Sequence, residues 1–525
     1  MYKLFLSLRY LRKRLIALFA VGSVTLCVFM VLVVISVMGG FLEMVKERSR
    51  GLLSDIVVDN ATLQGFPHYQ EFIDALQARM PDVVVTATPV IYNYAILRVQ
   101  ATKYTKPVRV VGIRLDKYEQ VNDFANSLWY DRFYPGTTSL GLQLQPVAGW
   151  DEHDNRVLPE PFESAHQKWR QTASAEELAE YDRMPYSPPP GARVFAQTVA
   201  PPGYVGGDEF EAEDLYGVII GCDVINERTK TGDYLRHYAL GSEMLLTLLP
   251  MTREGTVSGE GSTTLSLRYA DDSRTRVFEI DDLCVYVDFD MLQSVLAMNP
   301  QERIDGGFAP ARASQVLIRL AEGLDAKEVR ARIEEFWETF RASLDVDPLS
   351  LETQLLDFVS VETWEERQVQ FISAVEKEKV LVTILFAIVS VVAVVLIGCI
   401  FYMVVEKKTR DIGIVKSLGA SSSGVAAIFI LYGAAVGVVG SIIGSVAGVF
   451  FVRNINEIQD ALARLNPNLQ VWSPDVYTFD RIPNSVDPVE AVVIVVVAIV
   501  ASMLGALIPA LLAARVWPVD ALRYE

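Results

Sequence analysis

A short charged segment between two apolar runs, "VVEKKTRDIGIVKSLGASSSG" (404–424), holds the most suggestive chemistry. Two charged residues, Arg410 and Asp411, are followed by apolar residues at helical spacing: Ile412, Ile414, Val415 and Leu418. The pattern predicts a short amphipathic helix, closed by Gly419, with a cap on the next helix from one of the serines 421 to 423. An ordinary positive-inside turn would need only Lys407 and Lys408, whereas an apolar face is suited to dock in a groove on another protein.

Phosphate-binding, hydrolase and zinc motifs are absent from the sequence. There is no G-x-x-x-x-G-K-[ST], and the glycine-rich "GTVSGEGS" (255–262) has no lysine. No G-x-S-x-G, H-E-x-x-H or zinc-spaced Cys/His array occurs. "DEHD" (151–154) could bind a cation, but a solvated acidic loop is the commoner structure for such a run. The other histidines are scattered: His68, His166 and His237. We therefore predict a non-catalytic chain with no metal site.

The composition indicates a membrane part and an aqueous part, with 51% hydrophobic and 21% charged residues among 525. A bilayer core about 30 Å thick needs roughly 20 apolar residues as helix. Four stretches meet this condition: 15–38, 378–405, 423–452 and 489–514. The first exceeds the roughly 7–15 residues of a signal-peptide core and ends in "SVMGGF", so an uncleaved anchor is expected.

Basic residues near the span ends predict the orientation. The N-terminal segment 1–14 carries five Lys/Arg and no acid, and the 406–422 segment is also basic on balance. The 453–488 loop leans acidic. Both termini, including the 515–525 tail, are therefore expected in the cytoplasm, with residues 40–377 and 453–488 outside it. The net charge of −18 argues against nucleic acid as a partner.

The predicted fold is membrane α-helical, with four transmembrane helices and a large α+β extracytoplasmic domain between helices 1 and 2. The parts expected in that domain are a split α+β subdomain (about 50–120 and 310–345), an inserted β-rich module (about 212–300) and a Pro/Gly/acid-rich insertion of irregular, exposed structure (about 125–212). Strand-like segments of the module include "STTLSLRYA" (262–270) and "RTRVFEI" (274–280). A helical stalk over 361–380 leads into the second span.

Helix 326–340 is expected to bury one face formed by Val329, Ile333, Phe336 and Phe340. Cysteines are few: Cys27 and Cys399 lie in spans, and Cys222 and Cys284 lie outside, where a disulfide is permitted. Their spacing leaves pairing open.

Small residues recur in the third span at the spacing that lets helices approach closely in lipid. The glycines are Gly433, Gly437, Gly440, Gly444 and Gly448. Packing within one subunit and packing on a second subunit are both compatible with this pattern. The fourth span has Gly505 and Pro509, which predict a local kink. Few ionisable residues lie inside the spans, which disfavours a secondary transporter.

Several segments together resemble the FtsX/MacB-like family of ABC transporter permeases, and most closely its lipoprotein-releasing (Lol-type) branch. The matching segments are "SLRYLRKR" (7–14), "VISVMGGF" (34–41), "YGVIIG" (216–221), "LLTLLP" (245–250), "VETWEERQVQFISAVEKEK" (361–379), "VEKKTRDIGIVKSLGAS" (405–421) and "PVDALRYE" (518–525). The family architecture of one span, a large external domain and three further spans is also similar. The external domain is longer than usual, mainly at about 125–212.

The resemblance implies a permease subunit of the bacterial inner membrane, paired with a second permease, identical or paralogous, and with a dimer of cytoplasmic ABC ATPases. ATP and magnesium would bind to the ATPase, with no cofactor on this chain. The coupling contacts to the ATPase would be Arg410, Asp411, Ile412, Ile414, Lys416, Leu418 and Gly419. The substrate would be an acylated lipoprotein, extracted from membrane lipid and passed to a periplasmic carrier protein.

Two other functions stay open. A periplasm-to-outside efflux permease of the macrolide-exporter type is one, although such chains usually carry their own ATPase. A signalling permease that controls a cell-wall hydrolase is the other, although its members have small external domains.

Overall fold

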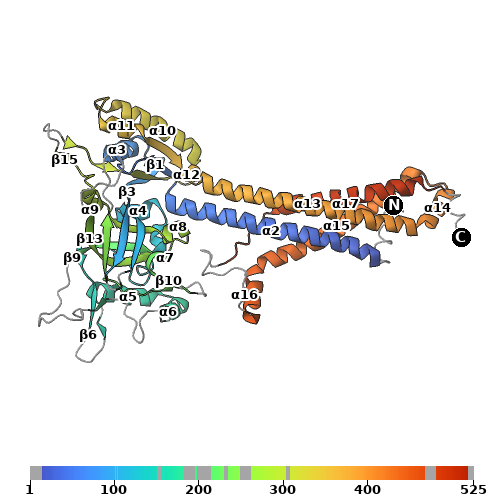
Figure 1. Cartoon of the computed structure of the whole chain (residues 1–525), viewed down its shortest axis with the longest axis horizontal. Helices are drawn as coiled ribbons and strands as arrows, with labels where there is room; N and C mark the ends of the chain where they lie inside the picture. The colour runs from blue at the N-terminus through green and yellow to red at the C-terminus, as the bar shows by residue number, and fades with distance from the viewer. Residues whose placement is uncertain are drawn as a thin grey trace. The chain divides into compact units, whose positions relative to one another are not determined.

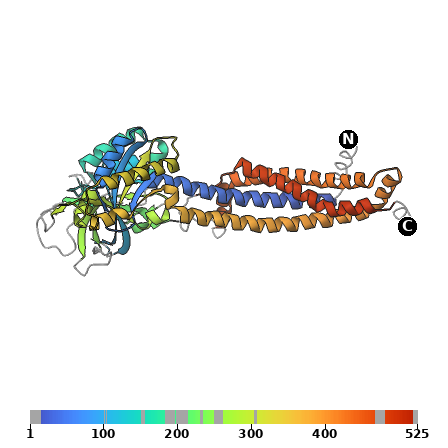
Figure 2. The ribbon, with the colours of Figure 1, turned by 90° about the horizontal axis from the view of Figure 1, so that it is seen from above.

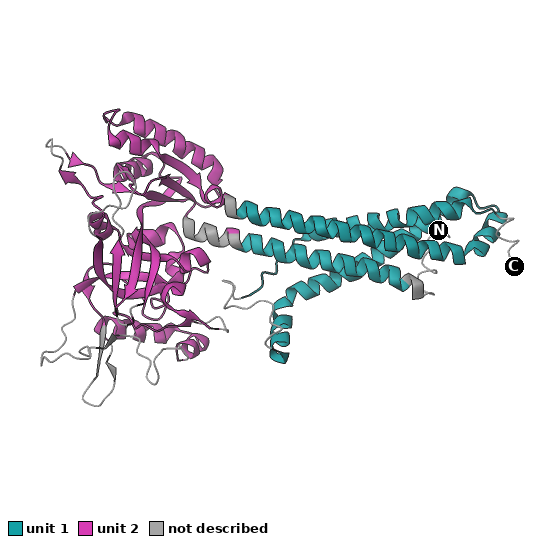
Figure 3. Ribbon diagram, viewed as in Figure 1, with its two compact units in different colours: residues 1–45, 370–472, 481–525 teal, residues 46–369, 473–480 magenta. Residues whose placement is uncertain are grey.

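The computed structural model describes residues 15–517 with several gaps. The gaps are residues 101, 103, 151–155, 158, 183–195, 198–213, 230–233, 249–261, 303–307 and 467–480. The expectations for the 1–14 segment, the acidic run at 151–154 and the tail beyond 517 lie outside the described residues, as does nearly all of the 255–262 run. The chain divides into two compact units (Figure 3). The helical unit comprises 1–45, 370–472 and 481–525, and the β-rich unit comprises 46–369 and 473–480.

Four long helices dominate the helical unit, with two short ones between them. They are α2 (Leu15–Leu53), α13 (Val369–Lys407), α14 (Thr409–Ser417), α15 (Ser422–Arg453), α16 (Ile455–Leu465) and α17 (Pro488–Arg515). Among the described residues, four segments are long and apolar enough to cross a membrane: Leu18–Met44, Ile372–Lys407, Ser422–Arg453 and Pro488–Arg515. Their helices run side by side (Figures 1 and 2). The coarse prediction of four apolar helices, with a β-rich domain between the first and second, agrees with the structure.

Local capping sets where these helices begin. The Ser421 side chain accepts a hydrogen bond from the Gly424 amide at 3.1 Å, as a helix N-cap does. Asp487 caps α17 by accepting from the Val489 amide at 2.8 Å, with Pro488 at the first helical position. α17 continues through Pro509 as one helix.

The stalk prediction over 361–380 is only partly right. Residues Val359–Thr363 form strand β19, and the short helix α12 (Trp364–Arg367) follows. Thr363 and Glu366 form a reciprocal capping box at the start of α12, which fixes a helix start there rather than a continuous stalk. The stalk helix α13 begins only at Val369.

Strands near both ends of the β-rich unit's sequence pair directly. The elements of this part are β1 (Ile56–Asn60), α3 (Tyr69–Arg79), β3 (Val84–Val99), β18 (Gln315–Leu320), α10 (Ala326–Ser343), α11 (Leu351–Asp357) and β19. β1 lies between β18 and β19 and is antiparallel to both. The α3 side chain Phe72 packs edge-on against Trp337 of α10, with ring centroids 5.0 Å apart.

The buried face of α10 differs from the predicted one. Val329, Ile333 and Trp337 are buried, whereas Phe336 and Phe340 are half-buried beside them. Spacing by four residues lets Trp337 fill the centre of the core, and the two phenylalanines flank it.

A closed ring of strands forms the centre of the β-rich unit. Its strands are β3, β4 (Thr105–Ile113), β14 (Cys284–Asp288), β9 (Asp214–Gly221), β13 (Thr263–Ser273) and β12 (Glu243–Leu248). They pair in that order, and β12 pairs back with β3 from Met244↔Val99 to Leu248↔Ala95. Alternate residues along a strand, such as Ala95, Leu97 and Val99 of β3, are buried in one core, as expected where successive side chains point to opposite faces.

The long strand β3 belongs to both parts. Its first half pairs with β18, from Val84 to Val90, and its second half pairs with β4, from Ile91 to Arg98. The split subdomain and the β-rich module are therefore joined through one continuous sheet.

The described part of the 125–212 insertion contradicts the expectation of irregular, exposed structure. Residues Glu160–Thr172 form α5 and residues Ala175–Asp182 form α6. Phe133 and Trp169 are buried, with ring centroids 5.2 Å apart. The Pro/Gly/acid composition predicted exposed loops, because local propensity does not show that aromatic residues far apart in the sequence pack together.

The strand expected at 274–280 is also wrong. β13 ends at Ser273, and Phe278–Asp281 form the short helix α8. The Asp281 carboxylate accepts hydrogen bonds from the amides of Thr275 and Arg276, both at 2.7 Å. These bonds fold the segment back on itself and remove its amides from strand pairing.

Candidate functional site

α14 connects two membrane-crossing helices and ends in a well-formed capping motif. The Gly419 amide donates to the Lys416 carbonyl at 3.0 Å, and the Ala420 amide donates to the Val415 carbonyl at 3.2 Å. This pair of bonds is the Schellman motif, which requires a left-handed residue at its turn. Gly419 supplies it with φ +94°. The glycine thus fixes where α14 stops.

One face of α14 is buried and another is open. Ile412 is only 6% exposed and joins the apolar cluster that contains Val405 and Phe429. Ile414 and Leu418 are 44% and 83% exposed. Arg410, Ile414 and Leu418 are spaced by four residues, so they form one stripe along the helix. We call these three residues the α14 stripe.

The charged residues of α14 divide between the surface and the bundle. Lys408 pairs with Asp411 at the helix start. The Lys416 ammonium donates to the carbonyls of Ala514 at 2.9 Å and Val516 at 2.7 Å. Those carbonyls lie at the C-terminal end of α17, where unpaired carbonyls and the helix dipole favour a cation. Lys416 therefore ties α14 to α17.

Other helices of this chain approach each of the five α15 glycines closely. A Cβ added at Gly433 would meet the Ala506 Cβ of α17 at 2.6 Å. One added at Gly440 would meet the Val24 Cβ of α2 at 2.7 Å. Gly437 likewise faces α17, and Gly444 and Gly448 face α2. The Gly433/Gly437 pair and the Gly440/Gly444/Gly448 run therefore let α15 approach two different helices of this chain closely. Packing on a second subunit stays a prediction.

A family model described as the FtsX-like permease C-terminal domain matches residues 383–518. Residues 383–518 form an FtsX-like permease domain. The resemblance inferred from the sequence is thereby confirmed for this part of the chain. Every predicted coupling residue and every predicted packing glycine lies inside the FtsX-like domain.

Curated relatives of this chain carry lipoprotein-release names. The lipoprotein-releasing system transmembrane protein LolC of Xylella fastidiosa (strain 9a5c) is 31% identical over 165 residues, covering 31% of this chain and 40% of the relative. LolC of Neisseria meningitidis serogroup B is 31% identical over 169 residues, covering 32% and 40%. LolE of Haemophilus influenzae is 31% identical over 120 residues, covering 23% and 29%. The chain thus spans two fifths or less of the length of these curated relatives.

A solved structure, the periplasmic region of MacB from Actinobacillus actinomycetemcomitans, covers 61% of this chain and 94% of its own, with 9% identity and a TM-score of 0.25.

At the opposite end of the FtsX-like domain's helices lies an ion pair that the sequence analysis missed. The Lys379 ammonium of α13 donates to the Glu490 carboxylate of α17 at 2.7 Å. Glu490 lies in the first turn of α17, whereas Lys379 lies well inside α13, at the start of its apolar run. Opposite charges at the ends of two apolar runs were the available signal. The Lys379–Glu490 pair joins α13 to the start of α17. Lys416 joins α14 to the opposite end of α17.

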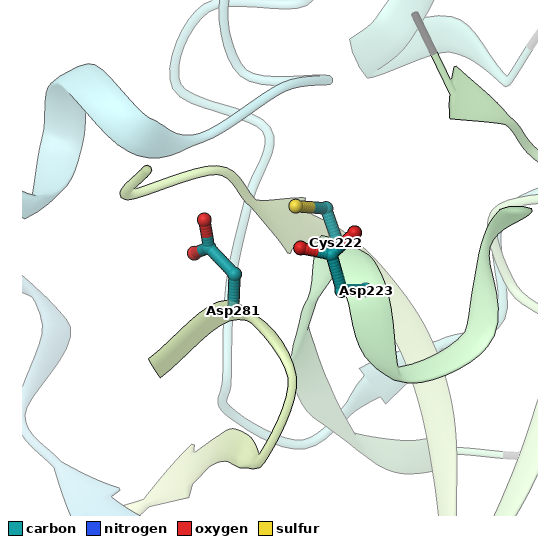
Figure 4. A group of neighbouring side chains, drawn as sticks. All are labelled: Cys222, Asp223 and Asp281. Atoms are coloured by element: carbon teal, nitrogen blue, oxygen red, sulfur yellow. The ribbon is translucent and has the colours of Figure 1, made fainter. Parts of the chain in front are cut away.

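A second candidate group lies in the β-rich unit. The ligand atoms of Cys222, Asp223 and Asp281 lie within 4.8 Å of one another (Figure 4). The Asp281 carboxylate already accepts from Thr275 and Arg276. Burial raises the pKa of Asp281 to about 7 and raises the pKa of the Cys222 thiol. The Asp281 oxygens are already engaged by these donors, and the bonds hold the β13–α8 turn.

The other cysteine outside the spans does not complete a disulfide. Cys222 and Cys284 are both buried and free. The Arg109 guanidinium donates to the Cys284 sulfur at 3.2 Å.

The histidines of the described residues serve local structure. His68 lies 2.7 Å from the Glu352 carboxylate, and His166 stacks on Trp169 with ring centroids 5.1 Å apart. Burial lowers the pKa of His166, so the ring is neutral where it packs.

Proposed function

We propose that this chain is the permease subunit of an ABC transporter that uses a separate cytoplasmic ATPase to release lipoproteins from the outer leaflet of the bacterial inner membrane. The FtsX-like domain and the LolC and LolE relatives support a permease of this kind. The observation that carries the proposal is the α14 stripe, because an apolar surface left open on a helix outside the spans needs a partner.

The seven residues proposed for coupling divide into three roles. Arg410, Ile414 and Leu418 form the surface that would dock on the ATPase, with Asp411 beside them held by Lys408. Ile412 and Lys416 face the other way, into the bundle. Gly419 sets the end of the helix. We therefore propose that the stripe receives the movement of the ATPase, and that Ile412 and Lys416 pass it on.

Two contacts connect α14 to long helices of the bundle. Ile412 packs in the same apolar cluster as Val405 of α13, and α13 is a single helix of 39 residues, which corresponds to roughly 58 Å at 1.5 Å per residue. Lys416 binds the end of α17 directly. ATP and magnesium would be bound by the partner ATPase, and a tilt of α14 would move both helices.

The substrate class follows from the relatives' names and from the energy needed. Withdrawing an acyl chain from lipid costs about 0.8 kcal/mol per CH₂, so extraction of an acylated protein requires an energy source. The expected assembly has both termini of this chain in the cytoplasm, a second permease subunit, a dimer of ATPases and a periplasmic carrier that accepts the lipoprotein.

The test is co-purification of the full chain in mild detergent, with identification of what accompanies it. An ABC ATPase together with acylated proteins is the expected result. An ATPase with an outer-membrane channel or adaptor would instead establish an efflux permease. An ATPase with a cell-wall hydrolase would establish a signalling permease.

The variant Leu418→Asp tests the docking surface itself. A charge in the centre of an apolar contact should reduce ATPase association at least about tenfold, equivalent to 1.4 kcal/mol. Leu349→Asp is the matched control, because Leu349 is 89% exposed and lies in the β-rich unit. Association of Leu418→Asp at the level of the control would refute the docking role of the stripe.

A further inference from the structure

The short helix α16 (Ile455–Leu465) has a sharply divided surface. Four aliphatic residues follow one another at intervals of three or four, namely Ile455, Ile458, Leu462 and Leu465. At 100° per residue they fall on one face, and Glu457, Asp460 and Arg464 fall on the opposite face. This division is sharper than in any of the long helices, whose surfaces are apolar nearly all round.

The described residues cover the apolar face of α16 only in part: Ile455 and Ile458 are half-buried. No residue of the helix is buried. Leu462 is 39% exposed and Leu465 is 81% exposed. A row of large aliphatic side chains open to water is unfavourable by about 25 cal/mol for each Å², so a stable molecule covers it.

The position of α16 identifies what covers it. Asn454 alone separates it from α15, whose end at Arg453 is the end of a membrane-crossing helix. The Asn456 side chain donates to the Ile482 carbonyl at 3.1 Å and accepts from the Ile482 amide at 2.8 Å. Residue 482 lies just before α17, which is also a membrane-crossing helix. The start of α16 is therefore held at the level where two spans leave the bilayer.

The lipid-facing surface of α15 continues toward α16. Ile443, Val446 and Phe450 of α15 are 49%, 67% and 68% exposed, as expected of side chains that face acyl chains. Figure 1 shows α16 turning sharply away from the direction of α15. A helix that leaves a span in this way and carries one apolar face fits the boundary between headgroups and acyl chains.

We propose that α16 lies in the membrane interface, with Ile455, Ile458, Leu462 and Leu465 inserted among the acyl chains and the charged face turned to water. The bound partner is the lipid surface itself. The helix has one arginine against two acids, so insertion depends on apolar contact and not on attraction to anionic headgroups. The inference requires that α15 and α17 cross the membrane, and it does not depend on the transport activity.

Site-specific fluorescence on the full chain in vesicles tests the proposal. A polarity-sensitive dye is attached at Leu465→Cys or, as the matched control, at Asp460→Cys on the opposite face. Both variants carry Cys399→Ser, because Cys399 is an exposed native thiol. The vesicles contain phosphatidylcholine with a nitroxide near the top of the acyl chain, about 5–10 Å below the headgroup boundary.

Insertion predicts blue-shifted emission and strong nitroxide quenching at position 465, with neither at position 460. Replacement of part of the phosphatidylcholine by phosphatidylglycerol should leave both signals unchanged. Water-like emission at both positions would overturn the proposal. Blue-shifted emission at 465 without quenching would also overturn it, because the face would then be covered by protein, either by another part of this chain or by a second copy.

Discussion

The two compact units are stabilised in different ways. The β-rich unit closes a ring of strands around large aliphatic and aromatic side chains, and it buries charged groups among them. In the helical unit, glycines let α15 approach its neighbours closely, and a small apolar cluster and polar contacts such as those of Lys379, Lys416 and Thr25 join the helices. In water, apolar side chains gain free energy by mutual burial. In lipid they gain little by leaving the acyl chains, so close backbone approach and polar contacts provide the stability.

The β-rich unit contains buried charged groups that are paired and hydrogen-bonded. Arg236 is 3% exposed and its guanidinium Nε donates to Asp272 at 3.0 Å while the group lies 3.9 Å above the Trp129 ring. The neighbouring Asp271 accepts from the amides of Tyr130 and Asp131 at 2.7 and 2.9 Å. These bonds fasten the start of the 125–212 insertion to β13. Two adjacent acids in a strand, "YADDS", were the signal available in the sequence.

The largest expected effect is from Arg236→Met in the β-rich unit. It leaves the Asp272 carboxylate buried without its cation, which typically costs about 3–5 kcal/mol. Denaturant unfolding of the full chain in detergent, followed through the tryptophans, measures the loss. Arg132→Met is the control, because its pair with Glu180 is 40% and 41% exposed and should contribute at most about 1 kcal/mol. Equal effects of the two variants would contradict the buried role of Arg236.

In the helical unit, Lys416→Met should cost about 1.5–3 kcal/mol, since it removes charge-assisted hydrogen bonds to two carbonyls. The ATPase should still bind, because the α14 stripe is intact, but substrate-stimulated ATP hydrolysis should fall. Lys407→Met removes an exposed charge at the end of α13 and should change neither measurement. Loss of ATPase binding in Lys416→Met would show that Lys416 belongs to the docking surface.

Gly444→Val tests packing by close approach. Even its Cβ would lie 2.7 Å from the Thr25 carbonyl oxygen of α2, and overpacking of this kind typically costs about 1–3 kcal/mol. Thermal unfolding in detergent should show a lower midpoint. Gly22→Ala on α2 is the control: a Cβ there meets nothing within 4 Å, so the variant should be neutral or more stable by about 0.5–1 kcal/mol. A tolerated Gly444→Val would mean that α2 and α15 do not need this contact.

A gradual pH dependence is also expected in the β-rich unit. Burial raises the pKa of Asp271 to about 8, against roughly 3.9 in the unfolded chain. Between these two pKa values the folded chain binds one more proton than the unfolded chain. The contribution of Asp271 to the free energy of unfolding is therefore complete below about pH 4 and is lost as the pH rises toward 8. The slope for one proton is about 1.4 kcal/mol per pH unit.

Asp271→Asn should reduce the fall in the free energy of unfolding by about 1.4 kcal/mol per pH unit when unfolding is measured from pH 5 to pH 8. Asp281, whose pKa burial raises to about 7, contributes in the same direction and remains in the variant. An unchanged slope would show that Asp271 is ionised in the folded state.

The sequence by itself determined the features that depend on local pattern. Apolar length marked the four spans, because a bilayer of fixed thickness sets the length of a spanning helix. The positions of α14 and Gly419 followed from helical spacing and from the conformational freedom of glycine at a positive φ. The recurring α15 glycines indicated close packing, although their partners could not be named.

Tertiary structure alone decided which groups meet. Nothing in the order of residues shows that Gly433 faces α17 while Gly440 faces α2, or that Lys416 reaches the end of α17. The aromatic contact between Phe133 and Trp169 and the closure of β12 on β3 join residues far apart in the chain. Pairings of this kind depend on the summed packing of the whole unit, so local propensity does not specify them.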